Sequence, residues 1–187
     1  MAEFHLETDR LIIRNWKDED RDLFYLINSD DTVMEFFPFR RNYDQSSQMM
    51  DRIRKNIEEV GFGFTAIELK QTGEVLGFCG LSDASAGDEM FGELIEIGWR
   101  LAPQYWGKGY ATESAKRLLQ FGFQKLNLPE IVSFAVHNNV RSLSVMERIG
   151  MTRDPSRDFD HAGVPDSHPH LKRHLTYFIN NPNKKGA

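Results

Sequence analysis

A strand pattern, a glycine-bearing turn and a helix pattern follow one another in the middle of the chain. Residues 93–101 alternate in polarity as a strand does, and residues 107–126 repeat their apolar positions with helical spacing. Gly107 and Gly109 lie between the two patterns and permit backbone angles that other residues resist. This succession gathers backbone N–H groups at the positive end of a helix, an arrangement that binds phosphates.

The remaining patterns predict a mixed α+β fold with one sheet. An antiparallel meander comes first, and a strand–helix–strand–helix run follows it. A segment over 30–42 has no clean period, and a loop rich in His, Pro and Gly covers 161–170. Strands are predicted over 7–16, 63–69, 75–81, 93–101, 130–136 and 171–179. A first helix is predicted to start at Asp18 and to carry the apolar stripe Leu23, Phe24, Leu26 and Ile27. Further helices are predicted over 44–60, 107–126 and 139–149.

Composition indicates one compact domain over residues 1–180 with a polar tail over 181–187. The 187 residues are 40% apolar and include 14 Phe, which is too much apolar surface for a disordered chain. Acidic residues outnumber basic ones, 28 to 23, so nucleic acid is not expected as a partner. We find no leader-like opening and no membrane-length apolar run, and the single Cys79 is expected to be buried, so the protein is expected to be cytoplasmic.

The glycine turn does not match the common nucleotide loops. It lacks the Lys-Ser/Thr ending of a P-loop, and its spacing is too short for the Gly-x-Gly-x-x-Gly of a dinucleotide fold. Taken alone, the turn is as consistent with a tight strand–helix connection as with a phosphate site.

Neighbouring segments add a family resemblance that covers nearly the whole chain. Trp106-Gly107-Lys108-Gly109-Tyr110-Ala111 resembles the Gln/Arg-x-x-Gly-x-Gly/Ala loop of the GNAT N-acetyltransferase superfamily, and residues 139–151 resemble its next helix. The ribosomal-protein (RimJ/RimL-type) branch is the most similar, because its opening resembles residues 6–11 and its late segment resembles residues 159–161.

The resemblance implies a GNAT fold, in which a mixed, twisted sheet with helices on both faces is splayed between the strands ending near Leu101 and Val136. The pantetheine arm of acetyl-CoA would enter the splay and bond the backbone of Leu101, and Asn139 would contact the same arm. Lys108 and Arg141 would meet the 3′-phosphate, unless they are ordinary surface charges. The pyrophosphate would be held by the backbone amides of Gly107, Lys108, Gly109, Tyr110, Ala111 and Thr112. Trp106, which precedes them, would belong to the same cofactor site.

Two residues depart from the family pattern. Trp106 stands where the loop usually begins with Gln or Arg, and Met146 stands where many members carry a tyrosine that protonates the departing thiolate. A thioether cannot donate a proton. Ser142, one turn earlier, corresponds to a serine of the Rim-type pattern and is expected to donate a hydrogen bond to the sulfur; its alternative role is to cap backbone groups.

Glu96 is the candidate general base. It shares a strand face with Gly98 and Arg100, and that face would have to turn toward the acceptor. The alternatives are that Glu96 pairs with Arg100 or faces solvent, and Glu93 is a weaker candidate. An α-amine, with a pKa of about 7.7–8.0, needs less help to lose its proton than a lysine at about 10.4.

Aromatic and histidine residues are the candidates for the acceptor side. Phe36, Phe37 and Phe39 are expected to wall the acceptor site, with ordinary core packing as the alternative. The histidines from His161 to His174 are expected to line the same side rather than to bind metal, because no clear carboxylate or thiol set accompanies them.

The resulting hypothesis is direct acetyl transfer from acetyl-CoA to a primary amine, without an acyl-enzyme or a metal. The preferred acceptor is the N-terminal α-amine of a protein or peptide. The enzyme itself is expected to be a monomer or a homodimer. Acetylation of small amines, amino acids or antibiotics remains open, as does a non-catalytic acyl-CoA-binding module.

Overall fold

The computed structural model describes residues 4–86 and 91–184. Residues 185–187 of the predicted tail and the first three residues lie outside this description. The described part forms one mixed sheet in the order β1-β2-β3-β4-β5-β6-β9-β7, with β8 paired to β9. The strands are β1 (His5–Glu7), β2 (Leu11–Arg14), β3 (Phe64–Leu69), β4 (Val75–Asp83), β5 (Ile95–Leu101), β6 (Glu130–Val136), β7 (Thr152–Arg153), β8 (Phe159–Asp160) and β9 (Arg173–Asn180).

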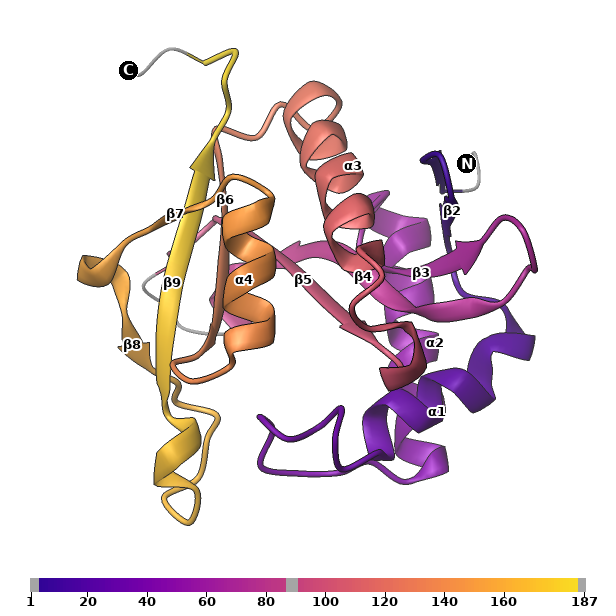
Figure 1. Cartoon of the computed structure of the whole chain (residues 1–187), viewed down its shortest axis with the longest axis horizontal. Coiled ribbons are helices and arrows are strands. Elements are labelled where there is room, and N and C mark those ends of the chain that lie inside the picture. The colour runs from indigo at the N-terminus through magenta and orange to yellow at the C-terminus, as the bar shows by residue number, and fades with distance from the viewer. Residues whose placement is uncertain (1–3, 87–90, 185–187) are drawn as a thin grey trace.

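Four α-helices cover the two faces of this sheet (Figure 1). They are α1 (Arg21–Ser29), α2 (Tyr43–Val60), α3 (Tyr110–Gln124) and α4 (Val140–Arg148). Leu118 of α3 and Met146 of α4 share one apolar core with Leu11 and Ile97 of the sheet. Phe24 of α1 and Met50 of α2 are buried in a second core with Phe78. The expected α+β class, with helices on both faces of one mixed sheet, is therefore confirmed.

Most of the predicted elements form where their periodicity places them. Strands β3, β4 and β5 make the predicted antiparallel meander, and β6 spans the predicted residues. Asn42 caps the start of helix α2, where its side chain accepts a hydrogen bond from the Gln45 N–H. Gly61 caps the end of the helix in the left-handed conformation. Cys79 is fully buried, as expected.

The predicted strand over 7–16 is confirmed only at Leu11–Arg14 (β2) and is otherwise too long, because the chain turns between Glu7 and Leu11. β1 and β2 pair with each other as antiparallel neighbours, with Leu6 opposite Ile13. The turn is fastened by Glu113, which lies more than 100 residues away and accepts hydrogen bonds from Thr8 and Arg10. No local pattern can reveal such a contact.

Three smaller differences have local causes. Helix α3 begins at Tyr110 rather than at residue 107, because Gly107 and Gly109 adopt positive φ values of 73° and 80°. Leu26, assigned to the apolar stripe of α1, is 40% exposed. The two-residue strands β7 and β8 are too short for a period to predict.

The sheet divides into two halves that are joined at one narrow junction. β5 and β6 run parallel and pair only at Ile95 with Ile131 and at Glu96 with Val132. One residue further on, the Ser133 hydroxyl donates to the Ile97 carbonyl at 2.8 Å. From there the two strands separate, so the edge of β5 up to Leu101 has no strand partner on the β6 side (Figure 1).

None of the described helices is long and apolar enough to cross a membrane.

Candidate active site

The glycine turn and the start of α3 leave backbone donors open. Gly109 is the N-cap of α3, and no side chain caps this end. The first intrahelical hydrogen bond runs from the Glu113 N–H to the Gly109 carbonyl, so the N–H groups of residues 110–112 have no acceptor within the helix. The helix dipole adds positive potential at the same place, so the turn suits an anion such as pyrophosphate.

Arg10 braces this turn, a contact that the sequence analysis missed. Its Nη1 donates to the Lys108 carbonyl at 3.1 Å, and its Nε donates to Glu113 at 2.6 Å. Its guanidinium carbon also lies 4.5 Å from the centroid of the Tyr110 ring. Arg10 therefore fixes the turn to the β1–β2 connection and adds positive charge beside it. The Leu6–Leu11 segment was matched to the family, but this residue was given no role.

Trp106 closes the turn against the end of β5. Its indole Nε1 donates to the Leu101 carbonyl at 2.7 Å. Arg141, at the start of α4, lies 4.6 Å from the Trp106 ring and forms an ion pair with Glu35 at 2.6 Å. Lys108 is exposed and forms no ion pair within the described residues. The residues predicted for acetyl-CoA thus gather from β5, the turn, α3 and α4.

Helix α4 places Ser142 in its first turn. The Asn139 side chain accepts from the Ser142 N–H at 3.2 Å and so caps the helix. The Ser142 hydroxyl has no hydrogen-bond partner among the described residues and is partly exposed. Met146, one turn later, is buried in the core. The capping role therefore falls to Asn139, and the Ser142 hydroxyl is left available.

Glu96 occupies the last paired position before β5 and β6 separate. Burial, together with the negative charge of Asp83 on neighbouring β4, raises its pKa to about 8. The carboxylate has no hydrogen-bond or ion-pair partner in the described part of the chain. The alternative of a Glu96–Arg100 ion pair is not seen, because Arg100 instead donates to the Asn28 side chain at 2.6 Å.

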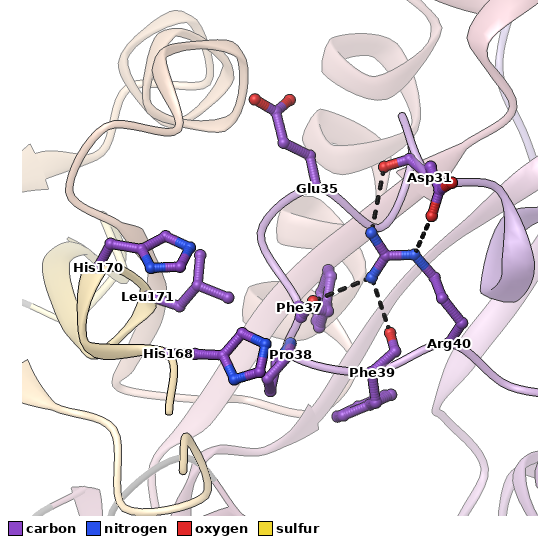
Figure 2. A pocket seen from close by; sticks show the side chains of 9 residues that line it. All are labelled: Asp31, Glu35, Phe37, Pro38, Phe39, Arg40, His168, His170 and Leu171. Atoms are coloured by element: carbon purple, nitrogen blue, oxygen red, sulfur yellow. Dashed lines mark hydrogen bonds and ion pairs between the residues drawn. The ribbon is translucent and has the colours of Figure 1, made fainter. Parts of the chain in front are cut away.

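A cavity of about 390 Å³ lies between the 30–42 segment and the loop before β9 (Figure 2). Two of the three predicted acceptor-side aromatics line it: Phe37 is 37% exposed and Phe39 is 43% exposed. Phe36 instead packs against Val136 and its neighbours. Figure 2 shows Asp31 and Arg40 paired at one wall and His168, His170 and Leu171 at the other.

The four histidines of the late segment separate into two groups. His168 and His170 line the cavity, whereas His161 and His174 stack against Phe159 and each other. Burial lowers the pKa of His174 to about 4, so it is neutral near pH 7. Among residues 4–86 and 91–184, no group of three or more His, Cys, Asp or Glu side chains is placed to hold a metal ion.

Two further arginines lie near this region and were not predicted as site residues. Arg100 projects from the same face of β5 as Glu96, and Arg41 follows the cavity-lining Phe39 and Arg40. No spacing in the sequence predicts that these two arginines are neighbours, because both are held by hydrogen bonds to the buried Asn28.

Comparison with known proteins identifies relatives along most of the chain. A family model described as "Acetyltransferase (GNAT) domain" matches residues 10–152. The protein YnaD of Bacillus subtilis (strain 168), named an uncharacterized N-acetyltransferase, is 32% identical over 80% of this chain and 84% of its own.

Solved structures share the fold. A GNAT-family acetyltransferase from Bacillus anthracis superposes with a TM-score of 0.78 at 23% identity, covering 95% of this chain and 98% of that one. A ribosomal-protein-S5-alanine acetyltransferase from Vibrio fischeri superposes with a TM-score of 0.75 at 15% identity, covering 97% of this chain and 99% of that one. At these identities the likeness is one of fold.

Proposed function

The chain belongs to the GNAT acetyltransferase family and is an N-acetyltransferase that uses acetyl-CoA; from this premise, we propose that its acceptor is the N-terminal α-amine of a protein or peptide. The observation that carries the proposal is the position of Glu96. It is an unpartnered carboxylate at the point where the sheet opens, on the strand whose free edge leads to the glycine turn.

The residues on the cosubstrate side fit acetyl-CoA. Acetyl-CoA supplies an acetyl group activated as a thioester. The open N–H groups at residues 110–112, with Gly107 and Gly109 making room for the backbone to approach, hold the pyrophosphate. The free edge of β5 bonds the pantetheine amides as a neighbouring strand would, and Asn139 contacts the same arm. Lys108 and Arg141 are available to the 3′-phosphate, although Arg141 must then leave Glu35.

Glu96 acts as the general base for the amine, and Ser142 acts as the hydrogen-bond donor to the leaving sulfur. The amine nitrogen attacks the thioester carbon while Glu96 accepts the proton that the nitrogen loses, directly or through one water. The carbon–sulfur bond breaks, and the Ser142 hydroxyl donates a hydrogen bond to the sulfur that departs. A thiol has a pKa of only about 8.5, so polarisation of the sulfur suffices and no tyrosine is required.

The basicity of Glu96 favours an α-amine over a lysine side chain. A base with a pKa of about 8 matches an α-ammonium group at about 7.7–8.0, whereas a lysine at about 10.4 would lie more than two pH units away. We assign the acceptor to the cavity between the 30–42 segment and the loop before β9, called the acceptor cavity below. It is open and lined by the exposed Phe37 and Phe39, a surface suited to a peptide segment. The same fold also serves a ribosomal-protein alanine acetyltransferase, which is consistent with this acceptor class.

The test uses two peptides of one sequence with acetyl-CoA and a thiol-release assay. One carries a free N-terminus and a blocked lysine, and the other carries a blocked N-terminus and a free lysine. We expect turnover of the first peptide only, with the acetyl group located on the α-amine by mass spectrometry.

Turnover of small amines, amino acids or aminoglycosides in place of either peptide would contradict the proposed acceptor and leave the acetyltransferase assignment standing. Saturable binding of acetyl-CoA without thiol release for any amine would indicate a non-catalytic binding module.

A further inference from the structure

Two arginines beside the acceptor cavity are tied to one buried asparagine. Arg100 Nη1 donates to the Asn28 side chain at 2.6 Å, and the Arg41 backbone N–H donates to the Asn28 carbonyl at 2.9 Å. Asn28 is fully buried in α1, and its Nδ2 donates to the Phe24 carbonyl. The asparagine therefore holds the two arginines, which are far apart in sequence, in one place.

Each guanidinium group lies against one aromatic ring of the cavity wall, although neither arginine is itself among the residues that line the cavity. Arg100 lies 4.3 Å from the centroid of Phe37, and Arg41 lies 4.7 Å from the centroid of Phe39. Both rings line the cavity shown in Figure 2. Arg100 also lies 5.3 Å from Phe78, its direct cross-strand partner on β4, so its side chain extends across the sheet rather than along β5 toward Glu96.

The pair lacks the negative charge that buried arginines normally face. No carboxylate of the described residues forms an ion pair with either group, and the Nε of Arg41 is buried without a hydrogen-bond partner. Burial lowers the pKa of Arg100 to about 9, and repulsion by Arg41 contributes to the shift. Arg52 likewise repels Arg41. Such an arrangement is unfavourable until an anion joins it.

We propose that Arg41 and Arg100 form a subsite for a carboxylate of the acceptor. This inference rests on the proposed function and narrows its substrate class. An arginine pair suits a carboxylate because each planar guanidinium offers several donors to its two oxygens. The subsite would select N-terminal segments that carry an acidic side chain.

The spacing on β5 indicates where the acidic residue lies in the acceptor. Glu96 and Arg100 are four residues apart on one face, which separates their Cα atoms by about 13 Å at roughly 3.3 Å per residue, and the Arg100 side chain extends away from Glu96. A free α-amino acid carries its amine and carboxylate on one carbon and cannot span this separation. An extended peptide spans it with an aspartate or glutamate two or three residues after the residue that carries the reacting amine.

The experiment compares peptides that differ only by Glu and Gln at position 3 or 4, all with a free N-terminus and no lysine. We expect the unmodified protein to show kcat/KM about tenfold higher for the glutamate peptide at the preferred position, the size of a charge-assisted hydrogen bond. Equal values at every position would overturn the inference and leave N-terminal acetylation intact. Turnover of small amines but of no peptide would overturn the proposed function as well.

Variants then assign the preference to the two arginines. In Arg41→Gln with Arg100→Gln, the ratio between the peptides is expected to fall to about one with an unchanged KM for acetyl-CoA, whereas Arg100→Lys keeps part of the ratio. Arg52→Gln is the matched control, because it removes an exposed positive charge near Arg41 and keeps both site arginines. A raised KM for acetyl-CoA with an unchanged peptide ratio would overturn the inference and assign the pair to the phosphates of the cosubstrate.

Discussion

Glu96 shows how the environment of one residue sets its chemistry. An exposed glutamate has a pKa near 4.5, too low to take a proton from an amine efficiently at neutral pH. At the junction of β5 and β6 the carboxylate loses hydration and faces Asp83, and the pKa rises to about 8. The carboxylate thereby gains the basicity that the proposed general base requires, without a dedicated partner.

The pH dependence of turnover tests this role. Glu96 accepts a proton only when it is ionised and the α-amine attacks only when it is neutral, so the logarithm of kcat/KM is expected to rise with a slope near two and to level off above about pH 8. In Glu96→Gln we expect kcat to fall by about 10²–10⁴-fold and the ascending limb assigned to Glu96 to disappear. The exposed Glu93→Gln serves as the control and should keep the limb. Glu96→Gln should keep only the limb of the amine, with a slope near one, and a slope that stays near two would exclude Glu96 as the base.

The role of an individual side chain could be predicted from sequence where its chemistry alone excludes a function. Met146 could be excluded as an acid from its chemistry, and it is buried. The Arg41–Arg100 pair could not be predicted, because 59 residues separate the two and their meeting depends on Asn28 in a third element. Arg10 was missed for the same reason, since its partner Glu113 belongs to a distant helix.

At the scale of elements, the start of α3 combines a tight turn with an open helix end. Gly109→Glu is expected to abolish detectable acetyl-CoA binding, because the side chain and its negative charge would enter the space intended for pyrophosphate. Calorimetric titration measures this loss.

Gly73→Glu is the matched control for backbone strain. Gly73 also has a positive φ, +74° against +80° for Gly109, and a Cβ there meets nothing within 4 Å. Its turn joins β3 to β4, away from α3. Gly73→Glu should lower stability by about 1–2 kcal/mol and leave acetyl-CoA affinity unchanged. Near-normal affinity in Gly109→Glu would refute the loop assignment.

Helices and long strands were the predictable elements, since each repeats its own period over many residues. The errors lie where a distant contact overrides the local pattern. Thr8 and Arg10 turn the predicted first strand into two strands because Glu113 accepts from both. The residues of β7 and β8 become strands only because β9 lies beside them.

At the scale of the molecule, the divided sheet would make the cosubstrate a structural partner under the proposed placement along β5. Two parallel residue pairs and the Ser133 hydroxyl join the sheet halves, and beyond them the edge of β5 is free. A pantetheine arm along this edge would bridge the halves. The family resemblance implied this splay, whereas its narrow width at residues 95–97 emerged only from the strand register.

Binding is therefore expected to stabilise the whole protein. Acetyl-CoA at about 100 times its Kd should add about 2.7 kcal/mol and raise Tm by roughly 5–10 °C. Hydrogen exchange should slow most over residues 97–101 and 107–112. Protection confined to the surface of α2, or no thermal shift at saturating concentration, would contradict the placement of the cosubstrate.

The same narrow junction has a consequence for how the molecule could be assembled. A chain cut between α3 and β6 would yield one piece with the β1–β5 meander and another with β6 and its antiparallel partner β9. Each piece keeps its own hydrogen-bonded strands, and little backbone pairing holds one to the other. Reassociation of two such fragments would bury the apolar core that Leu118 and Met146 share, and acetyl-CoA along the free edge of β5 would add to that binding energy, so the recovered activity should rise with acetyl-CoA concentration.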